Sequence, residues 1–132
     1  MNQVTTILTV TDRLSYLESQ LQALENQTVD SDIFIHWNTD KEYTYNYPAL
    51  IYTNQHKRAP LYNRFFNSLQ FSTPYVFICD DDILPGKKYL ERCINFVESN
   101  NACIVSYGMI FAEEETQYKV KERIEHRNYL ST

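Results

Sequence analysis

Three consecutive acids, Asp80, Asp81 and Asp82, are the residues of this chain whose types and spacing most clearly suggest chemistry. They follow an apolar run, Tyr75–Cys79, and precede a Pro-Gly pair. The run predicts a buried strand with the acids at its carboxyl end, where neighbouring carboxylates repel one another unless a positive group lies close by. A divalent metal ion holding a phosphate is the natural candidate, since Mg²⁺ and Mn²⁺ prefer oxygen ligands. The alternative is a solvated acidic turn before a helix, where the helix dipole favours Asp.

The positions of the three acids suggest a different role for each. If the segment stays extended, Asp80 and Asp82 point in one direction and Asp81 in the other. We expect Asp82 to be the direct metal ligand because it lies furthest out of the strand, with Asp80 reaching a ribose or a metal-bound water. Ligands of open α/β sheets bind at the carboxyl ends of the strands, so position and chemistry agree.

The rest of the chain predicts strands that alternate with helices. Apolar and β-branched runs predict strands at Val4–Val10, Ile33–Trp37, Ala49–Thr53, Tyr75–Cys79 and Ala102–Tyr107. We therefore expect an α/β fold, an open and mostly parallel sheet flanked by helices.

Three helices are expected between the strands. The first runs to about Gln27, is capped by Thr11 or Asp12 and carries a leucine stripe; the second begins at Pro60 and buries Leu61, Phe65, Phe66 and Leu69; the third follows Gly86 and buries Tyr89, Leu90, Cys93, Ile94 and Val97. For the charged segment 112–132 we favour a helix, and a strand at Tyr118–Val120 is the alternative. Alternating Tyr43, Tyr45 and Tyr47 fit a loop or an edge strand equally.

Length and composition limit the class of protein. With 132 residues, 43% of them hydrophobic, the chain fits a single domain, 1–132. A net charge of -5 without a long basic run disfavours nucleic acid as a partner. Cys79, Cys93 and Cys103 lack C-x-x-C spacing, which predicts reduced core residues in a cytoplasmic protein. No basic leader or bilayer-length apolar stretch appears, so we expect a soluble protein without a membrane span.

The acidic stretch resembles the D-x-D motif of nucleotide-sugar-dependent glycosyltransferases of the GT-A fold. Thr11-Asp12-Arg13 and the helix that ends in Leu24–Thr28 look like the opening strand and helix of family-two glycosyltransferases. The stretch Arg58–Phe66 (R-A-P-L-Y-N-R-F-F) resembles the Arg/Asn-containing helix of that family and of exostosin-like transferases. The likeness covers roughly Val4 to Phe111, and its D-x-D region is the most specific part.

The resemblance implies a donor site for a nucleoside diphosphate sugar, in particular a UDP-sugar. Mn²⁺ or Mg²⁺ would bridge the donor diphosphate and Asp82, with Asp80 as the second metal ligand. The other donor-binding residues implied are Thr9, Thr11, Asp12 and Asn38 for the nucleobase, Arg58 and Arg64 for the phosphates, and Asp80 and Asp81. Many relatives carry an acid where this chain has Asn38, which leaves the identity of the base open.

The chain also departs from the family in length. Such transferases continue into an acceptor-binding half that supplies the catalytic base, and this chain ends at Thr132. No base is identified, because Glu113, Glu114 and Glu115 are better explained as a surface charge run. A truncated chain, a site completed by a second copy or a partner chain, and a non-catalytic nucleotide-sugar-binding module all stay open. So do the acceptor (glycan, lipid or protein) and the choice between inverting and retaining chemistry.

Overall fold

The computed structural model describes residues 2–47, 50–53, 60, 62–105, 107–111 and 120–125. The chain divides into two compact units, residues 1–91 and 92–132. The prediction of a single domain is not tested by this division. None of the helices in the described part of the chain has the length and apolar content that a membrane crossing requires.

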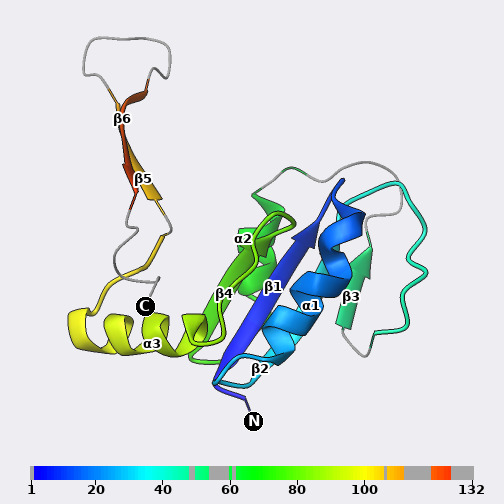
Figure 1. Ribbon diagram of the computed structural model, residues 1–132, viewed down its shortest axis with the longest axis horizontal. Helices are drawn as coiled ribbons and strands as arrows, with labels where there is room; N and C mark the ends of the chain where they lie inside the picture. The colour runs from blue at the N-terminus through cyan, green and yellow to red at the C-terminus, as the bar shows by residue number, and fades with distance from the viewer. Residues whose placement is uncertain are drawn as a thin grey trace. The chain divides into compact units, whose positions relative to one another are not determined.

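The first unit is built on a four-stranded sheet in the order β3-β2-β1-β4, in which every neighbouring pair is parallel. Its strands are β1 (Val4–Val10), β2 (Ser31–Trp37), β3 (Leu50–Thr53) and β4 (Tyr75–Asp80). All seven residues of β1 are buried, as the β-branched run predicts for a central strand. Figure 1 shows β1 in blue between β4 and the strands of the other side. The predicted open α/β sheet is confirmed.

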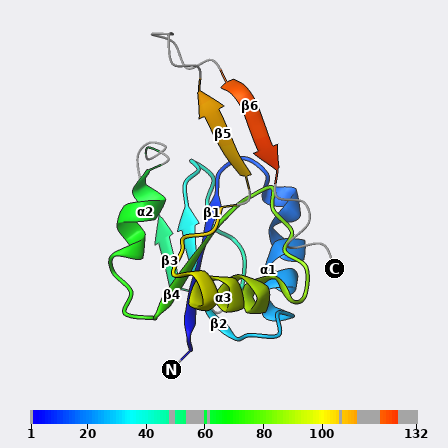
Figure 2. The same cartoon turned by 90° about the vertical axis from the view of Figure 1, so that its left-hand side faces the viewer.

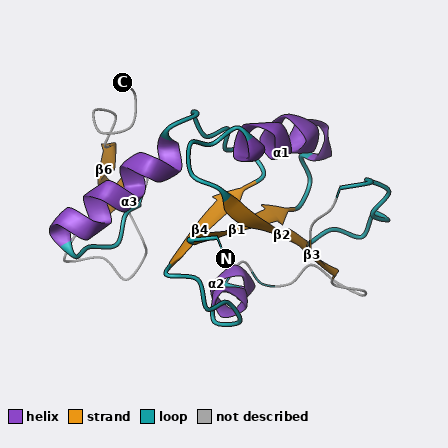
Figure 3. Cartoon of the chain, turned by 90° about the horizontal axis from the view of Figure 1, so that it is seen from below, coloured by secondary structure: helices purple, strands orange, loops and turns teal. Residues whose placement is uncertain are grey.

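Two helices cover opposite faces of this sheet (Figure 3). A short 3-10 helix (Leu14–Tyr16) and α1 (Leu17–Glu25) connect β1 to β2, and α2 (Asn63–Ser68) precedes β4. The apolar core lies on the α1 side and consists of Leu8, Val10, Leu17, Leu21, Leu24, Ile35, Trp37 and Cys79. The leucine stripe is therefore buried as predicted. The predicted cap is wrong, since neither Thr11 nor Asp12 caps either helix.

Helix α2 is rotated relative to the prediction. Phe65, Phe66 and Leu69 were expected to be buried, yet they are exposed, Leu69 by 80%; Leu61 lies outside the described residues. The buried residue of α2 is Asn67, and Arg64 forms an ion pair with Asp80 of β4. The arginine of the helix, and not its aromatic residues, therefore faces the sheet, where it forms a charge-assisted contact with the half-exposed Asp80 carboxylate.

Helix α3 (Tyr89–Asn100) begins after a turn at Gly86. It buries Leu90 and Ile94 and half-buries Tyr89, Cys93 and Val97, so its predicted apolar face is confirmed. Burial, together with the nearby carboxylates of Asp80 and Asp82, raises the pKa of the Cys79 thiol to about 12, which keeps this core residue protonated. Cys103 is exposed, which corrects its prediction as a core residue.

The second unit contains a two-stranded antiparallel sheet of β5 (Tyr107–Phe111) and β6 (Val120–Glu125), whose antiparallel arrows are clear in Figure 2. Two predictions are wrong here. Residues 102–105 form no strand, and the strand that follows pairs with β6 instead of extending the parallel sheet. Residues 120–125 form a strand where we favoured a helix, since the four-residue spacing of Val120 and Ile124 puts them on one face in both structures.

Replacement of Leu24 by alanine tests where the core lies. Leu24 is buried on the α1 side, so Leu24→Ala should lower the free energy of unfolding by about 2–5 kcal/mol. The matched variant Leu69→Ala, on exposed α2 surface, should change it by less than about 0.5 kcal/mol. Urea unfolding followed by circular dichroism measures both. Equal losses for the two variants would contradict the outward orientation of α2.

Candidate functional site

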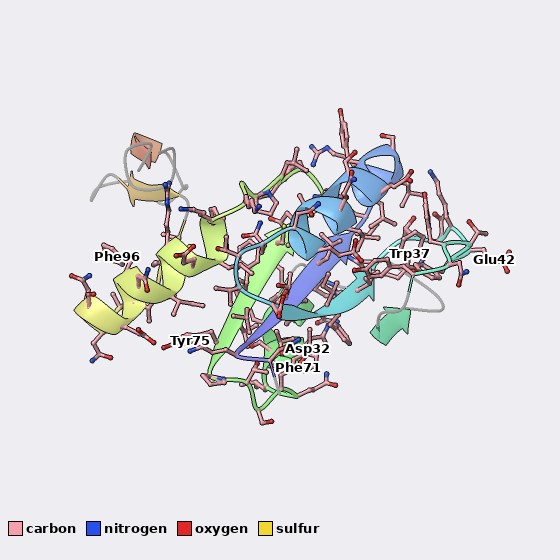
Figure 4. The ribbon with its side chains drawn as sticks, turned by 60° about the horizontal axis from the view of Figure 1, so that its bottom comes forward. Asp32, Trp37, Glu42, Phe71, Tyr75 and Phe96 are labelled. Carbon is pink, nitrogen blue, oxygen red and sulfur yellow. The ribbon has the colours of Figure 1, made fainter. Side chains whose placement is uncertain are left out.

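The acids lie at the topological switch point of the sheet. From β1 the chain passes through α1 to β2 on one side, whereas β4 lies on the other side and is reached through α2. Thr9 of β1 is in register with Asp80 of β4, so both strands end at the same edge. In Figure 4, Trp37 marks the same end of β2 and Asp32 the opposite end. Open α/β sheets bind ligands in the crevice at such a point.

The middle acid, Asp81, holds the segment Thr11–Arg13 that leaves β1. Its Oδ2 accepts hydrogen bonds from the backbone N–H groups of Thr11 at 2.9 Å, Asp12 at 3.1 Å and Arg13 at 3.3 Å. The Thr11 hydroxyl donates to the same oxygen at 2.5 Å. Asp81 is buried, and this set of donors satisfies its carboxylate within the protein.

The charge of Asp81 is stabilised by these donors. Burial opposes ionisation, but the hydrogen bonds from the Thr11 hydroxyl and from the N–H groups of Thr11, Arg13 and Asp12 outweigh it. They lower the pKa of the Asp81 carboxyl below its ordinary value. The carboxylate is therefore an anchor between the ends of β4 and β1.

The outer acids each pair with an arginine. Arg13 Nη1 lies 2.8 Å from Asp82 Oδ2 and 3.2 Å from Asp81 Oδ1. Arg64 Nη1 forms an ion pair with Asp80 Oδ1. The side chains of Arg13 and Asp82 are 50% and 52% exposed, so solvent and ligands reach this pair. The strand ends at Asp80, and Asp81 and Asp82 lie in a turn, so the extended conformation on which the expected alternation depended is absent.

A polar row crosses the sheet on the α2 side at the same level. Asp80, Thr9 and His36 are in register on β4, β1 and β2. Thr9 and His36 are buried. Burial, and secondarily the charge of Arg64, lowers the pKa of His36 below its ordinary value of 6.5. His36 therefore stays neutral beside the guanidinium.

The structure brings most of the predicted site residues to this edge, in different states of exposure. Thr9 and Asn38 are buried, and the Asn38 N–H donates to the Val10 carbonyl at 2.8 Å. Thr11 is half-buried and Asp12 is exposed. Arg58 and Glu113–Glu115 lie outside the described residues.

Two residues of this edge were not predicted as site residues. Arg13 belongs to the Thr-Asp-Arg motif but was given no role, although the parallel order of β1 and β4 makes it a neighbour of the acids. Gln20 of α1 donates hydrogen bonds to the carbonyls of Asp80 and Ile83. A polar residue between Leu17 and Leu21 in the buried stripe is the signal that points to it.

The donor set suits a metal ion that keeps substrate oxygens and water. Within the described residues, no group of three or more His, Cys, Asp or Glu side chains forms a cage for a metal ion. Asp80 and Asp82 offer half-exposed carboxylates, and Asp81 is saturated by its own hydrogen bonds. Mg²⁺ is commonly held by one or two carboxylates together with substrate phosphates, which this arrangement can provide.

Replacement of Asp81 by asparagine tests the anchor. Asp81→Asn keeps the shape of the side chain but removes the charge that accepts four hydrogen bonds at Oδ2. We expect the free energy of unfolding at pH 7 to fall by about 2 kcal/mol, as for hydrogen bonds to a charged group. The exposed Asp30→Asn is the control and should match the wild type. Urea unfolding of the wild type, Asp81→Asn and the control variant measures these free energies. An unfolding midpoint of Asp81→Asn equal to that of the wild type would contradict the role of Asp81 as an anchor.

The buried His36 predicts a pH dependence of stability. Its pKa is lowered in the folded protein, so the unfolded chain takes up the proton first as the pH falls below 6.5. The stabilising contribution is complete above that pH and is lost as the pH falls towards the folded pKa, with a slope of at most about 1.4 kcal/mol per pH unit. The difference in unfolding free energy between wild type and His36→Gln should therefore shrink from pH 8 to pH 5. A constant difference would contradict a neutral buried His36.

A search of curated proteins finds no match. The family model described as the glycosyl transferase family 64 domain matches residues 4–130, nearly the whole chain. This confirms the broader prediction of a glycosyltransferase, while the family-two and exostosin-like likenesses stay predictions. The chain belongs to the family described as the glycosyl transferase family 64 domain. It is therefore an enzyme that transfers a sugar from a donor to an acceptor.

Proposed function

We propose that this glycosyltransferase takes its sugar from a nucleoside diphosphate sugar, a UDP-sugar, and that Mn²⁺ or Mg²⁺ assists at the carboxyl ends of β1 and β4. The observation that carries the proposal is the pair of accessible ion pairs, Arg13 with Asp82 and Arg64 with Asp80. Both pairs lie at the carboxyl end of β4, where they supply two carboxylates and two guanidinium groups.

A metal diphosphate is the kind of ligand that matches such a set of charges. The guanidinium groups of Arg13 and Arg64 present planar donors suited to phosphate oxygens. The carboxylates of Asp82 and Asp80 suit a hard divalent cation. Because the ligand brings both signs of charge, it can take over both members of each ion pair without leaving a charge unpaired.

The four side chains of the two ion pairs differ in how accessible they are to a ligand that would replace their partners. Asp82 and Arg13 are half exposed, whereas Arg64 is mostly buried. Arg64 would therefore meet a ligand only with the exposed part of its guanidinium group, while Arg13 and Asp82 present about half of their side chains to solvent. We propose Asp82, with Asp80, as the residues that hold the metal ion, and Arg64 and Arg13 as the residues that bind and orient the diphosphate.

The metal ion and the two arginines would both supply positive charge to the donor diphosphate. When bound, a divalent ion neutralises the charge that develops on the leaving nucleoside diphosphate. The two arginines supply further positive charge to the same oxygens and hold the donor in one orientation. Asp12, exposed beside them, is the best placed of the residues predicted for the nucleobase, since Thr9 and Asn38 are buried.

Titration with UDP in the presence and absence of Mn²⁺ tests this proposal. Wild-type protein should bind UDP more tightly with Mn²⁺, and Asp82→Asn should weaken the Mn²⁺-dependent binding by about tenfold or more, or about 1.4 kcal/mol. Calorimetry measures the affinity, and release of UDP from UDP-sugars measures turnover.

Asp30→Asn is the matched control, because it removes one exposed carboxylate far from these residues in the sequence. It should leave UDP affinity and its response to Mn²⁺ unchanged. UDP binding that ignores Mn²⁺ and survives Asp82→Asn would rule out the metal and diphosphate site. GDP titrated in the same way reports the preference for the base.

A further inference from the structure

Two glutamines are buried in the region of helix α1, one within its leucine face and one just beyond its end. Gln20 is 1% exposed and Gln27, just beyond the end of the helix, is 7% exposed. A buried amide is costly unless its donors and acceptor find partners. Gln20 donates to the carbonyls of Asp80, the last residue of β4, and of Ile83, although its Oε1 has no partner among the described residues. Gln27 contacts the segment after β4 and also donates to the Ala23 carbonyl of α1. The two side chains therefore join the α1 region to the stretch that carries the acids.

Gln20 holds the acidic turn, which we define as Asp80–Ile83. Its Nε2 donates to the carbonyl of Asp80 at 2.9 Å and to the carbonyl of Ile83 at 2.8 Å. Only the amide nitrogen can donate to two carbonyls, so the orientation of the side chain is determined. The Ile83 N–H donates to the Asp80 carbonyl at 3.2 Å and closes the same turn. One side chain therefore fixes both ends of the turn that presents Asp81 and Asp82.

Gln27 holds a different part of the same segment. Its Nε2 donates to the carbonyl of Gly86 at 2.9 Å, and its Oε1 accepts from the N–H of Leu90 at 3.1 Å. These contacts fasten the start of α3 and do not involve the acids. Gln27 is thus a natural internal comparison: it is buried in the same region and makes the same kind of hydrogen bonds, but not to the acidic turn.

We propose that Gln20 is a positioning residue for the proposed metal and diphosphate site. Thr11–Arg13 lead into α1 and donate to Asp81, while Gln20 of α1 holds the backbone on both sides of Asp81. Both sides of the site are therefore fixed relative to one helix. The consequence for ligand binding rests on the proposed function; the consequence for the turn itself does not.

Gln20→Met isolates this role. Methionine has a similar length and can fill the buried space, but it leaves the carbonyls of Asp80 and Ile83 without the amide donor. The acidic turn should open more often, and Asp82 should present its carboxylate less reliably. The matched variants are Gln27→Met, at a position that is also buried, and Gln22→Met, on the exposed face of α1.

Amide hydrogen exchange is the readout that needs no ligand. Gln20→Met should accelerate exchange of the Ile83 N–H, whereas Gln27→Met should accelerate exchange of the Leu90 N–H, its direct partner. In the wild type, Ile83 should be protected as strongly as the amides of α1, because the turn opens only when its contact with α1 breaks. Exchange of the wild-type Ile83 N–H tests the positioning role even if a variant fails to fold.

UDP titration with Mn²⁺ is the second readout. Gln20→Met should weaken Mn²⁺-dependent UDP binding by about tenfold, the usual lower range for loss of a residue that orients a metal ligand. Gln27→Met should stay within about twofold of the wild type even though both variants lose stability, since its partners lie outside the acidic turn. Gln22→Met should behave as wild type in both assays.

The outcomes separate the positioning role from the proposed function. Rapid exchange of Ile83 in the wild type, or the same Ile83 exchange in Gln20→Met and Gln27→Met, overturns the positioning role. Equal weakening of UDP binding by those two variants also overturns it, because Gln20 would then act only through general stability. If wild-type protein binds no UDP with Mn²⁺ while Ile83 responds to Gln20→Met as expected, the proposed function fails and the support of the turn by Gln20 stands.

Discussion

The structure around the candidate site depends on how three adjacent carboxylates are kept together at the end of one strand. Their mutual repulsion would favour an open, solvated segment, and each is met by hydrogen-bond donors or a cation from the protein. Asp81 receives backbone N–H groups and a hydroxyl, Asp82 receives Arg13, and Asp80 receives Arg64. Two of these partners come from the segment after β1 and one from α2. The acids therefore connect elements that the sheet alone would leave independent.

The two faces of the sheet serve different purposes. On the α1 side the strands present Leu8, Val10, Ile35 and Trp37 to the leucines, and this face supplies the apolar burial that stabilises the first unit. On the α2 side the strands end in a polar row that includes Thr9, His36 and Asp80. A helix over polar residues gains more from an arginine than from aromatic residues, which explains the outward position of Phe65 and Phe66.

The same difference explains which parts of the fold could be predicted. Strands β1, β2 and β4 have continuous apolar or β-branched runs, and α1 has leucines at helical spacing, so local pattern and tertiary environment agree. Helix α2 has an equally clear apolar stripe, but its side towards the sheet carries Asn67 and an arginine paired with a residue distant in the sequence, which a local pattern does not encode. Strand β6 is charged at most of its positions and depends on pairing with β5, which a local pattern does not encode.

The acids themselves could be found from the sequence, but their separate roles could not. Adjacent residues of one type look equivalent in a sequence, and the expected alternation of side chains assumed that the strand continues through Asp82. It ends at Asp80 because Gln20 and the Ile83 N–H satisfy the Asp80 carbonyl within a turn. The turn directs Asp81 into the N–H groups of Thr11–Arg13, and these donors are then no longer available to an anion. For the proposed diphosphate, positive charge would come from side chains that can exchange partners, and within the described part of this edge Arg13 and Arg64 are the arginines paired with the acids.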